Sequence, residues 1–152
     1  MTAVDSLAYH LRETFELPQP AIDWLLILWS AIQTFDDFAD GDRVERAELD
    51  ALIWNTLVAL PCHPFFAANA QALGGAVSTA VLKWQASDKA ERDGFADARS
   101  FVWRAGFYDV VLVVLNLCYG PRVAQSKAHL VMHLYGERLD DYLKEFDHAR
   151  AD

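Results

Sequence analysis

Apolar residues recur along this chain at intervals of three and four, the spacing of one face of a helix. Leu7, Leu11 and Phe15 form the first such stripe, which stops before Pro18 and Pro20. Later segments repeat the spacing between glycine and proline signals. The sequence therefore predicts an all-α single domain over residues 1–152, a bundle of about six helices at residues 4–16, 21–41, 42–60, 64–88, 95–117 and 123–146.

Several of the predicted helix ends carry residues that favour a terminus. Gly41 is a suitable C′ residue for the second helix. Asp42, with Glu45 three residues later, is typical of a capping box and predicts the start of the third helix. Pro61 is expected to end that helix, and a break is expected at Gly136 in the last segment.

Two of the predicted helices carry an apolar stripe. The third helix is predicted to place one stripe on a single face: Leu49, Leu52, Ile53, Leu57 and Leu60. The C-terminal segment carries a second, which needs a surface to cover it: Leu139, Tyr142, Leu143 and Phe146. Because a small bundle hides only a limited apolar area, we expect the chain to form a homo-oligomer.

Composition narrows the class of protein. The chain is 53% hydrophobic, and its 13 basic and 22 acidic residues give a net charge of −9, which argues against disorder and against nucleic acid as a partner. Two cysteines, Cys62 and Cys118, fit free thiols in a reducing cytoplasm. Neither a secretory signal nor a membrane span is predicted, because the longest apolar runs are too short.

The most informative chemistry lies at the end of the second predicted helix. Asp36 and Asp40 are i, i+4 neighbours and Asp37 and Asp40 are i, i+3, so three carboxylates surround one patch. Carboxylates near a helix C-terminus repel one another and the helix dipole, and a divalent cation relieves both effects. The alternative is a solvated helix end that Arg43 or Arg46 neutralises.

Asp109 is a second acidic candidate because it interrupts an apolar helix. It falls on a predicted stripe made of Ala98, Phe101, Ala105, Asp109, Leu112 and Asn116. A carboxylate on a buried stripe needs a partner, for which Arg104, Arg99 or a metal shared with Asp36 and Asp40 is suitable. We therefore expect Asp109 to point toward the acidic end of the second helix.

Residues 36–40, Asp-Asp-Phe-Ala-Asp, resemble the DDxxD motif of the class I isoprenoid (terpenoid) synthases. Those all-helical proteins use the motif to hold Mg²⁺ against a substrate diphosphate. The resemblance implies that Asp36, Asp37 and Asp40 bind Mg²⁺ or Mn²⁺ and that a diphosphate-containing small molecule is the ligand. Asp109 and Asn116 are the nearest counterparts of that family's second metal motif, and Arg43 or Lys83 would meet phosphate.

A longer resemblance is to small proteins encoded by tailed bacteriophages and prophages. It rests on residues 34–42 together with residues 51–54 and 60–66. It implies a location in the host cytoplasm or in the virion, and it assigns no chemistry or catalytic residue.

Two classes of function follow from these patterns. The first is a small helical protein with a divalent-metal acidic cluster, for which the DDxxD resemblance implies a diphosphate ligand. As an enzyme it would give Lewis-acid assistance to a departing diphosphate. The alternative is a non-catalytic phage structural or host-interaction protein that acts as a homo-oligomer. His129 and His133, at i, i+4, lack an obvious third metal ligand and are predicted to be a surface or half-buried pair.

Overall fold

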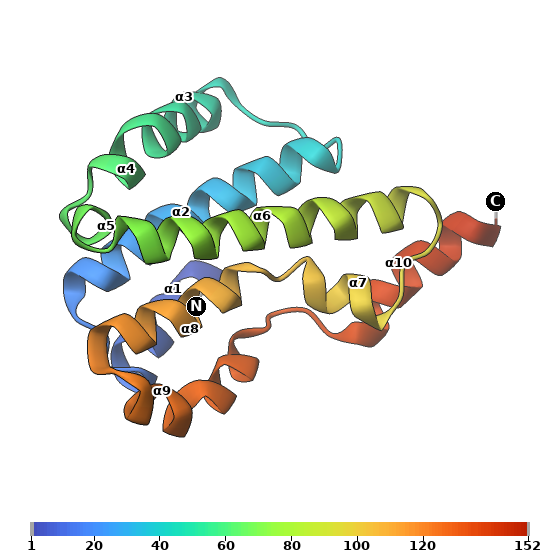
Figure 1. Cartoon of the computed structure of the whole chain (residues 1–152). Helices are drawn as coiled ribbons and strands as arrows, with labels where there is room; N and C mark the ends of the chain where they lie inside the picture. The colour runs from blue at the N-terminus through green and yellow to red at the C-terminus, as the bar shows by residue number, and fades with distance from the viewer. Residues whose placement is uncertain (1, 152) are drawn as a thin grey trace. The chain divides into compact units, whose positions relative to one another are not determined.

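The computed structural model describes the backbone of residues 2–151 and the side chains of residues 2–147. Every regular element in that range is helical, which confirms the all-α prediction (Figure 1). The described residues form nine uninterrupted helical stretches, because three of the predicted helices are each broken once. The estimate of about six helices was therefore too low.

The chain divides into two compact units, which we call unit 1 (residues 1–70) and unit 2 (residues 71–152). The expectation that residues 1–152 behave as one domain, and the isoprenoid-synthase-like arrangement, both stay predictions. Within the described range no helix is long and apolar enough to cross a membrane.

Unit 1 begins with a helix that packs on a longer one. α1 (Ala3–Tyr9) continues without interruption into the π-helical turn η1 (His10–Thr14), close to the predicted bounds. Both contact α2 (Gln19–Ala39), which starts just after Pro18. The buried side chains of this part include those of Leu11, Phe15, Trp24 and Leu25.

The rest of unit 1 is a helical arm that runs along α2 (Figure 1). It consists of α3 (Arg46–Trp54), the π-helical turn η2 (Asn55–Ala59) and α4 (Leu60–Cys62), followed by α5 (Pro64–Ala68). The helix therefore passes through Pro61 and ends two residues later than predicted, after Cys62. In these four elements no side chain is fully buried.

The start of the arm corrects the predicted cap. Residues 42–45 are not helical, and the N-cap is Glu45 instead of Asp42. The carboxylate of Glu48 accepts a hydrogen bond of 2.9 Å from the backbone N–H of Glu45. The capping-box spacing is thus present three residues further along the chain than the sequence suggested.

Trp24 fixes the far end of the arm to α2. Its indole N–H donates a 3.3 Å hydrogen bond to the backbone carbonyl of Leu60, and its ring stacks on Phe66 at 6.0 Å. In a continuous α-helix that carbonyl would accept from residue 64, but Pro64 has no N–H. The indole therefore takes the place of the donor that the proline removes.

Unit 2 is built on α6 (Ala70–Arg92), the longest helix. The helix predicted over residues 64–88 is broken at Asn69, where the backbone leaves the helical region. The helix predicted over residues 95–117 is also broken, into α7 (Ala98–Trp103) and α8 (Phe107–Tyr119), with a turn at residues 104–106. In that turn Gly106 lies against Ala80 of α6.

The C-terminal part of unit 2 contains the third break. α9 (Pro121–Lys127) follows Gly120 directly and continues into the 3₁₀ helix η3 (Ala128–Leu134). Residues 135–138 are not helical, which confirms the break at Gly136, and α10 (Leu139–Ala151) follows. α10 contacts α7, and Tyr142 on its predicted apolar stripe is completely buried.

Candidate functional site

The acidic end of α2 forms as the sequence predicts. Gly41 has φ +79°, and the N–H of Gly41 donates to the Phe38 carbonyl at 3.2 Å. The N–H of Asp42 donates to the Asp37 carbonyl at 2.9 Å, which completes a Schellman turn. Asp36 and Asp37 are half-buried on the last helical turn, and Asp40 is exposed at its C-cap.

These carboxylates do not form a ready metal site. Among the residues that the structure describes, no three His, Cys, Asp or Glu side chains come close enough together to hold one metal ion. Mg²⁺ typically takes one or two carboxylates and completes its shell with water and phosphate oxygens. Binding of Mg²⁺ or Mn²⁺ at Asp36, Asp37 and Asp40 therefore stays a prediction.

Arg43, predicted to meet phosphate, is engaged by a neighbour. Its Nε lies 2.8 Å from Oε1 of Glu45, the cap of α3, and both side chains are exposed. An exposed ion pair of this kind contributes little to stability and exchanges readily. A phosphate would have to compete with Glu45 for the guanidinium.

Lys83, the other predicted phosphate ligand, pairs with Asp109. Lys83 Nζ lies 2.6 Å from Asp109 Oδ2, and the ammonium stands 5.8 Å from the centre of the Trp103 ring. The sequence predicts that Asp109 needs a partner, but it favours Arg104, Arg99 or a metal. In the structure the partner is Lys83, which lies on α6.

The buried face of α8 differs from the predicted stripe. Its buried residues are Phe107, Val110, Val111, Val114 and Leu115. Asp109 lies beside this face with its side chain 42% exposed, and Asn116 is exposed. The turn at residues 104–106 shifts the helical phase, so the stripe of α7 does not continue into α8. Because Asp109 and Asn116 belong to unit 2, their expected approach to Asp36 and Asp40 stays a prediction.

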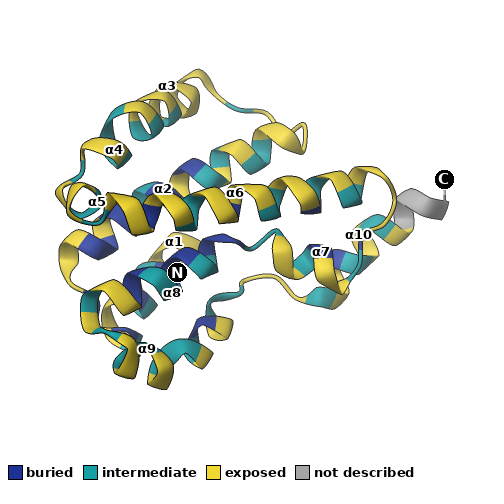
Figure 2. Cartoon of the chain, in the orientation of Figure 1, coloured by how far each residue is buried: buried dark blue, intermediate teal, exposed yellow. Residues whose placement is uncertain are grey.

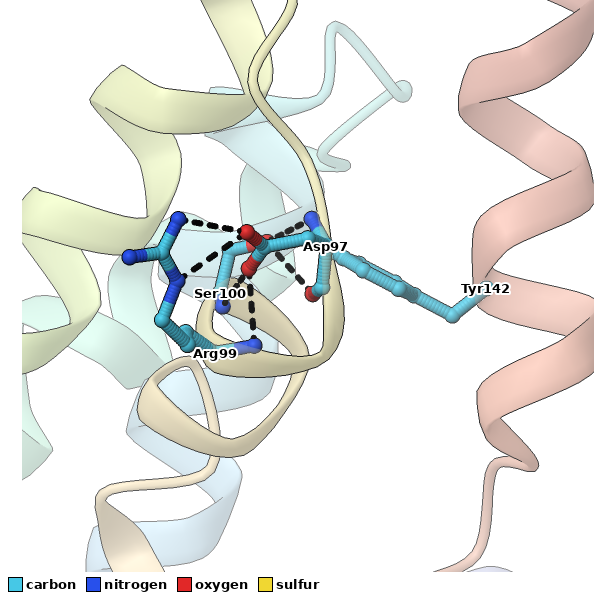
Figure 3. A network of polar contacts seen from close by, with 4 residues as sticks. All are labelled: Asp97, Arg99, Ser100 and Tyr142. Atoms are coloured by element: carbon cyan, nitrogen blue, oxygen red, sulfur yellow. Dashed lines mark hydrogen bonds and ion pairs between the residues drawn. The ribbon is translucent and has the colours of Figure 1, made fainter.

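A polar network that the sequence did not indicate joins three helices of unit 2 (Figure 3). At the start of α7, Asp97 caps the helix and accepts hydrogen bonds from Arg99 and Ser100. The Ser100 hydroxyl lies 2.7 Å from the hydroxyl of Tyr142 on α10, which donates to Glu91 of α6 at 2.7 Å. Figure 3 shows Tyr142 reaching across from its own helix to Ser100.

The network also contains Ser87 and Arg104, and every member has a partner. Ser87 donates to the Ser100 carbonyl at 2.8 Å, and the Arg104 guanidinium lies over the Tyr142 ring, 3.6 Å from Glu91. Burial raises the pKa of Tyr142 above its usual value. Among the described side chains no buried polar atom lacks a partner, so we interpret the network as a structural connection of α10 to α7 and α6.

This connection covers part of the C-terminal apolar stripe from within the chain. Tyr142 contacts the ring of Phe101 on α7 and that of Phe146 on its own helix, at 5.3 and 4.9 Å between ring centres. Leu139, Leu143 and Phe146 remain half-buried. A homo-oligomer stays a prediction.

An open, mostly apolar pocket of about 350 Å³ lies next to the network. Ala86 and Ala90 of α6 line it, together with Phe95 and Trp103, and the Asp97–Arg99 ion pair lies at its edge. The polar groups at this edge are bonded to one another in the cap of α7. The pocket therefore offers a ligand an apolar surface.

Large apolar side chains are exposed on the arm of unit 1. On the predicted apolar stripe of the third helix, Leu49, Ile53 and Leu57 are exposed, at 42%, 48% and 71%, and Trp54 beside them is 62% exposed. We call Leu49, Ile53 and Leu57 the arm face. Figure 2 shows α3 as exposed and half-buried along its length.

Charge is distributed unequally between the units. Residues 1–70 carry 3 basic and 11 acidic side chains, a net charge of −8, whereas residues 71–152 carry 10 basic and 11 acidic side chains, a net charge of −1. Nearly all of the excess negative charge therefore belongs to the unit that carries the arm face.

Other candidate ligands are dispersed. His129 and His133 are both exposed on η3, where three residues per turn place positions i and i+4 on different sides. Cys62 and Cys118 are free thiols, as expected. No protein-family model, curated protein or solved structure matches this chain. The candidate surfaces are therefore defined by its own geometry and charge.

Proposed function

We propose that this protein is a non-catalytic interaction protein that binds an amphipathic helix of another protein on the arm face. The observation that carries the proposal is the exposure of Leu49, Ile53 and Leu57, which follow one another at helical spacing on one side of α3 and η2. If the chain is phage-encoded, as its resemblance implies, the partner belongs to the host or to the virion.

The arm face has the composition of a helix-binding surface. Apolar side chains at i, i+4 and i+8 match the anchors of a helix that lies in a groove or along another helix. Trp54 stands next to them, and tryptophan is enriched among the side chains that contribute most to protein–protein binding. The arm contains no fully buried residue. Its apolar side chains therefore stabilise the fold less than a buried stripe of the same spacing would.

A direct titration tests this proposal. The probe is a fluorescently labelled amphipathic peptide of about 18 residues, long enough to form a helix on binding, with leucine on one face and glutamine elsewhere. We expect saturable binding to the full chain, and at least about a tenfold loss of affinity in the Ile53→Ser/Leu57→Ser variant.

The matched control removes exposed apolar side chains elsewhere. Val81 and Leu82 of α6 are 46% and 64% exposed, so Val81→Ser/Leu82→Ser changes a similar surface in unit 2. It should bind the peptide like the unchanged chain. Equal binding by both double variants, or no binding by any protein, contradicts the arm face as a binding site.

A second candidate is binding of a divalent metal at the end of α2. Its support is that Asp36 and Asp37 lie on the last turn of α2 and Asp40 is its C-cap, just before Gly41 with its positive φ. The partial negative charge of a helix C-terminus adds to theirs, which favours a cation there. In this version of the function Arg43 or Lys83 would release its carboxylate partner to meet a diphosphate.

Thermal unfolding tests the metal candidate. A ligand that binds only the folded chain stabilises it by about 2.7 kcal/mol at 100 times its dissociation constant. Millimolar Mg²⁺ or Mn²⁺ should raise the melting temperature relative to EDTA at equal ionic strength, and Asp37→Asn should reduce the shift. Identical melting curves under all conditions remove this candidate, and pyrophosphate added with Mg²⁺ tests the diphosphate.

A further inference from the structure

We infer that the partner helix is basic, with lysine or arginine flanking its apolar face. This inference rests on the proposed function, because it names the chemistry of the partner that the arm face binds. Its support is the negative charge of unit 1, which carries the arm face. This charge is a separate observation from the exposed apolar side chains.

The charge of unit 1 is not cancelled within the unit. It has only three basic side chains, and each lies in an ion pair with an acid of the same unit: Arg12 with Glu13, Arg43 with Glu45 and Arg46 with Asp50. With 11 acidic side chains in residues 1–70, a net charge of −8 remains. A field of one sign over a surface attracts a partner of the opposite sign and accelerates its association.

Acidic residues also lie next to the arm face in sequence. Glu48 and Asp50 are the immediate neighbours of Leu49 on α3, and both are exposed. A helix that places leucines on Leu49 and Ile53 would bring its flanking residues near these carboxylates. Lysine or arginine at those flanking positions gains favourable interactions, whereas glutamate or aspartate is repelled.

The same charge disfavours two other occupants. Two copies that met through their arm faces would each bring a unit of net charge −8 to the contact. Nucleic acid carries one phosphate charge per nucleotide and would be repelled as well. A basic amphipathic helix satisfies both the apolar side chains and the charge.

Three matched peptides separate this inference from the proposed function. They share the leucine face of the probe described above and carry glutamine, lysine or glutamate at the flanking positions. For the full chain at low salt, we expect the lysine peptide to bind about tenfold more tightly than the glutamine peptide and the glutamate peptide to bind more weakly. The difference should shrink as the salt concentration rises to about 0.5 M, because screening shortens the range of the field.

The charge of the arm itself is tested by isosteric variants. Glu48→Gln/Asp50→Asn keeps side-chain oxygens that accept the hydrogen bonds from Glu45 N–H and Arg46 Nε. It should lower the affinity for the lysine peptide several-fold and leave the affinity for the glutamine peptide unchanged. The control, Glu145→Gln/Asp147→Asn, neutralises two exposed acids of α10 in unit 2 and should change neither affinity.

The outcomes are distinct. Equal affinities for the lysine, glutamine and glutamate peptides, with loss of all three in Ile53→Ser/Leu57→Ser, overturn the basic partner and leave the arm face as a binding site. Absence of binding by every peptide overturns both proposals. If sedimentation shows that the chain dimerises and that Ile53→Ser/Leu57→Ser abolishes the dimer, a second copy occupies the face and the basic partner is wrong.

Discussion

Gly106 lies directly on the backbone of Ala80. A Cβ atom built on Gly106 would be 2.9 Å from the Ala80 Cα and 3.0 Å from both its Cβ and its carbonyl oxygen. The backbone at Gly106 has φ −59°, which any residue adopts, so the requirement for glycine comes from packing alone. The close approach of α8 to α6 depends on the missing side chain.

We therefore expect Gly106→Ala to lower the free energy of unfolding by about 1–3 kcal/mol, the usual cost of overpacking. Gly75→Ala is the matched control, because an added Cβ there meets nothing within 4 Å and the residue lies inside α6. That change should raise stability by roughly 0.5–1 kcal/mol through helix propensity. Urea unfolding measures both, and equal effects of the two changes would contradict the close contact.

Trp24 and Trp54 offer a second matched pair in unit 1. Trp24→Phe removes the hydrogen bond to Leu60 and leaves a cavity beside Phe66, so we expect a loss of about 2–3 kcal/mol. Trp54→Phe changes an exposed ring and should alter stability by less than about 0.5 kcal/mol. Chemical unfolding followed by circular dichroism compares them, and a similar loss in both would argue against the role of Trp24.

Tyr142→Phe tests the connection of α10. The change keeps the ring contacts and removes the hydroxyl that bonds Ser100 and Glu91, while Ser100 keeps its bonds to Asp97 and Glu91 keeps Arg104. We expect a loss of about 1–3 kcal/mol and faster amide exchange in α10. Tyr9→Phe, on an exposed side chain, is the control and should have no measurable effect.

Alkaline pH should destabilise unit 2 through its tyrosines. Burial raises the pKa of Tyr108 to about 12 and raises the pKa values of Tyr135 and Tyr142 as well. As the pH rises past the usual tyrosine value of about 10, the unfolded chain loses phenolic protons that the folded chain keeps, so stability falls by up to about 1.4 kcal/mol per pH unit for each group.

Below about pH 9 the same groups are protonated in both states and should have no effect on stability. Unfolding measured from about pH 8 to about pH 11, with tyrosinate absorbance followed in parallel, checks the direction. Tyr108→Phe should make the alkaline slope shallower. A slope that is unchanged in this variant would show that other groups carry the dependence.

The sequence predicted those helix ends that local chemistry determines. Gly41 has the positive φ that ends α2, and Gly136 lies in the break before α10. The start of α3 was wrong by three residues because both Asp42 and Glu45 have an acid at the third position after them, Glu45 and Glu48 respectively. Spacing alone does not distinguish two overlapping caps.

Features that depend on tertiary contact could not be predicted. Gly106 has the pattern of a residue inside a helix, but it lies in the turn that separates α7 from α8 and packs against Ala80. That turn moves Asp109 off the predicted stripe and next to Lys83, 26 positions earlier. The Tyr142 network likewise joins residues from three separate helices, for which sequence periodicity has no signal.

The π-helical turn η2 has a consequence for related sequences. A π turn contains one residue more than an α turn, so it is what a single-residue insertion leaves in a helix that keeps both of its ends in place. A chain shorter by one residue within 55–59 would form a plain α-helix with the same fold. The carbonyl of Leu60 would then stay within reach of the Trp24 indole, so we expect related chains that differ in length here to keep tryptophan at position 24.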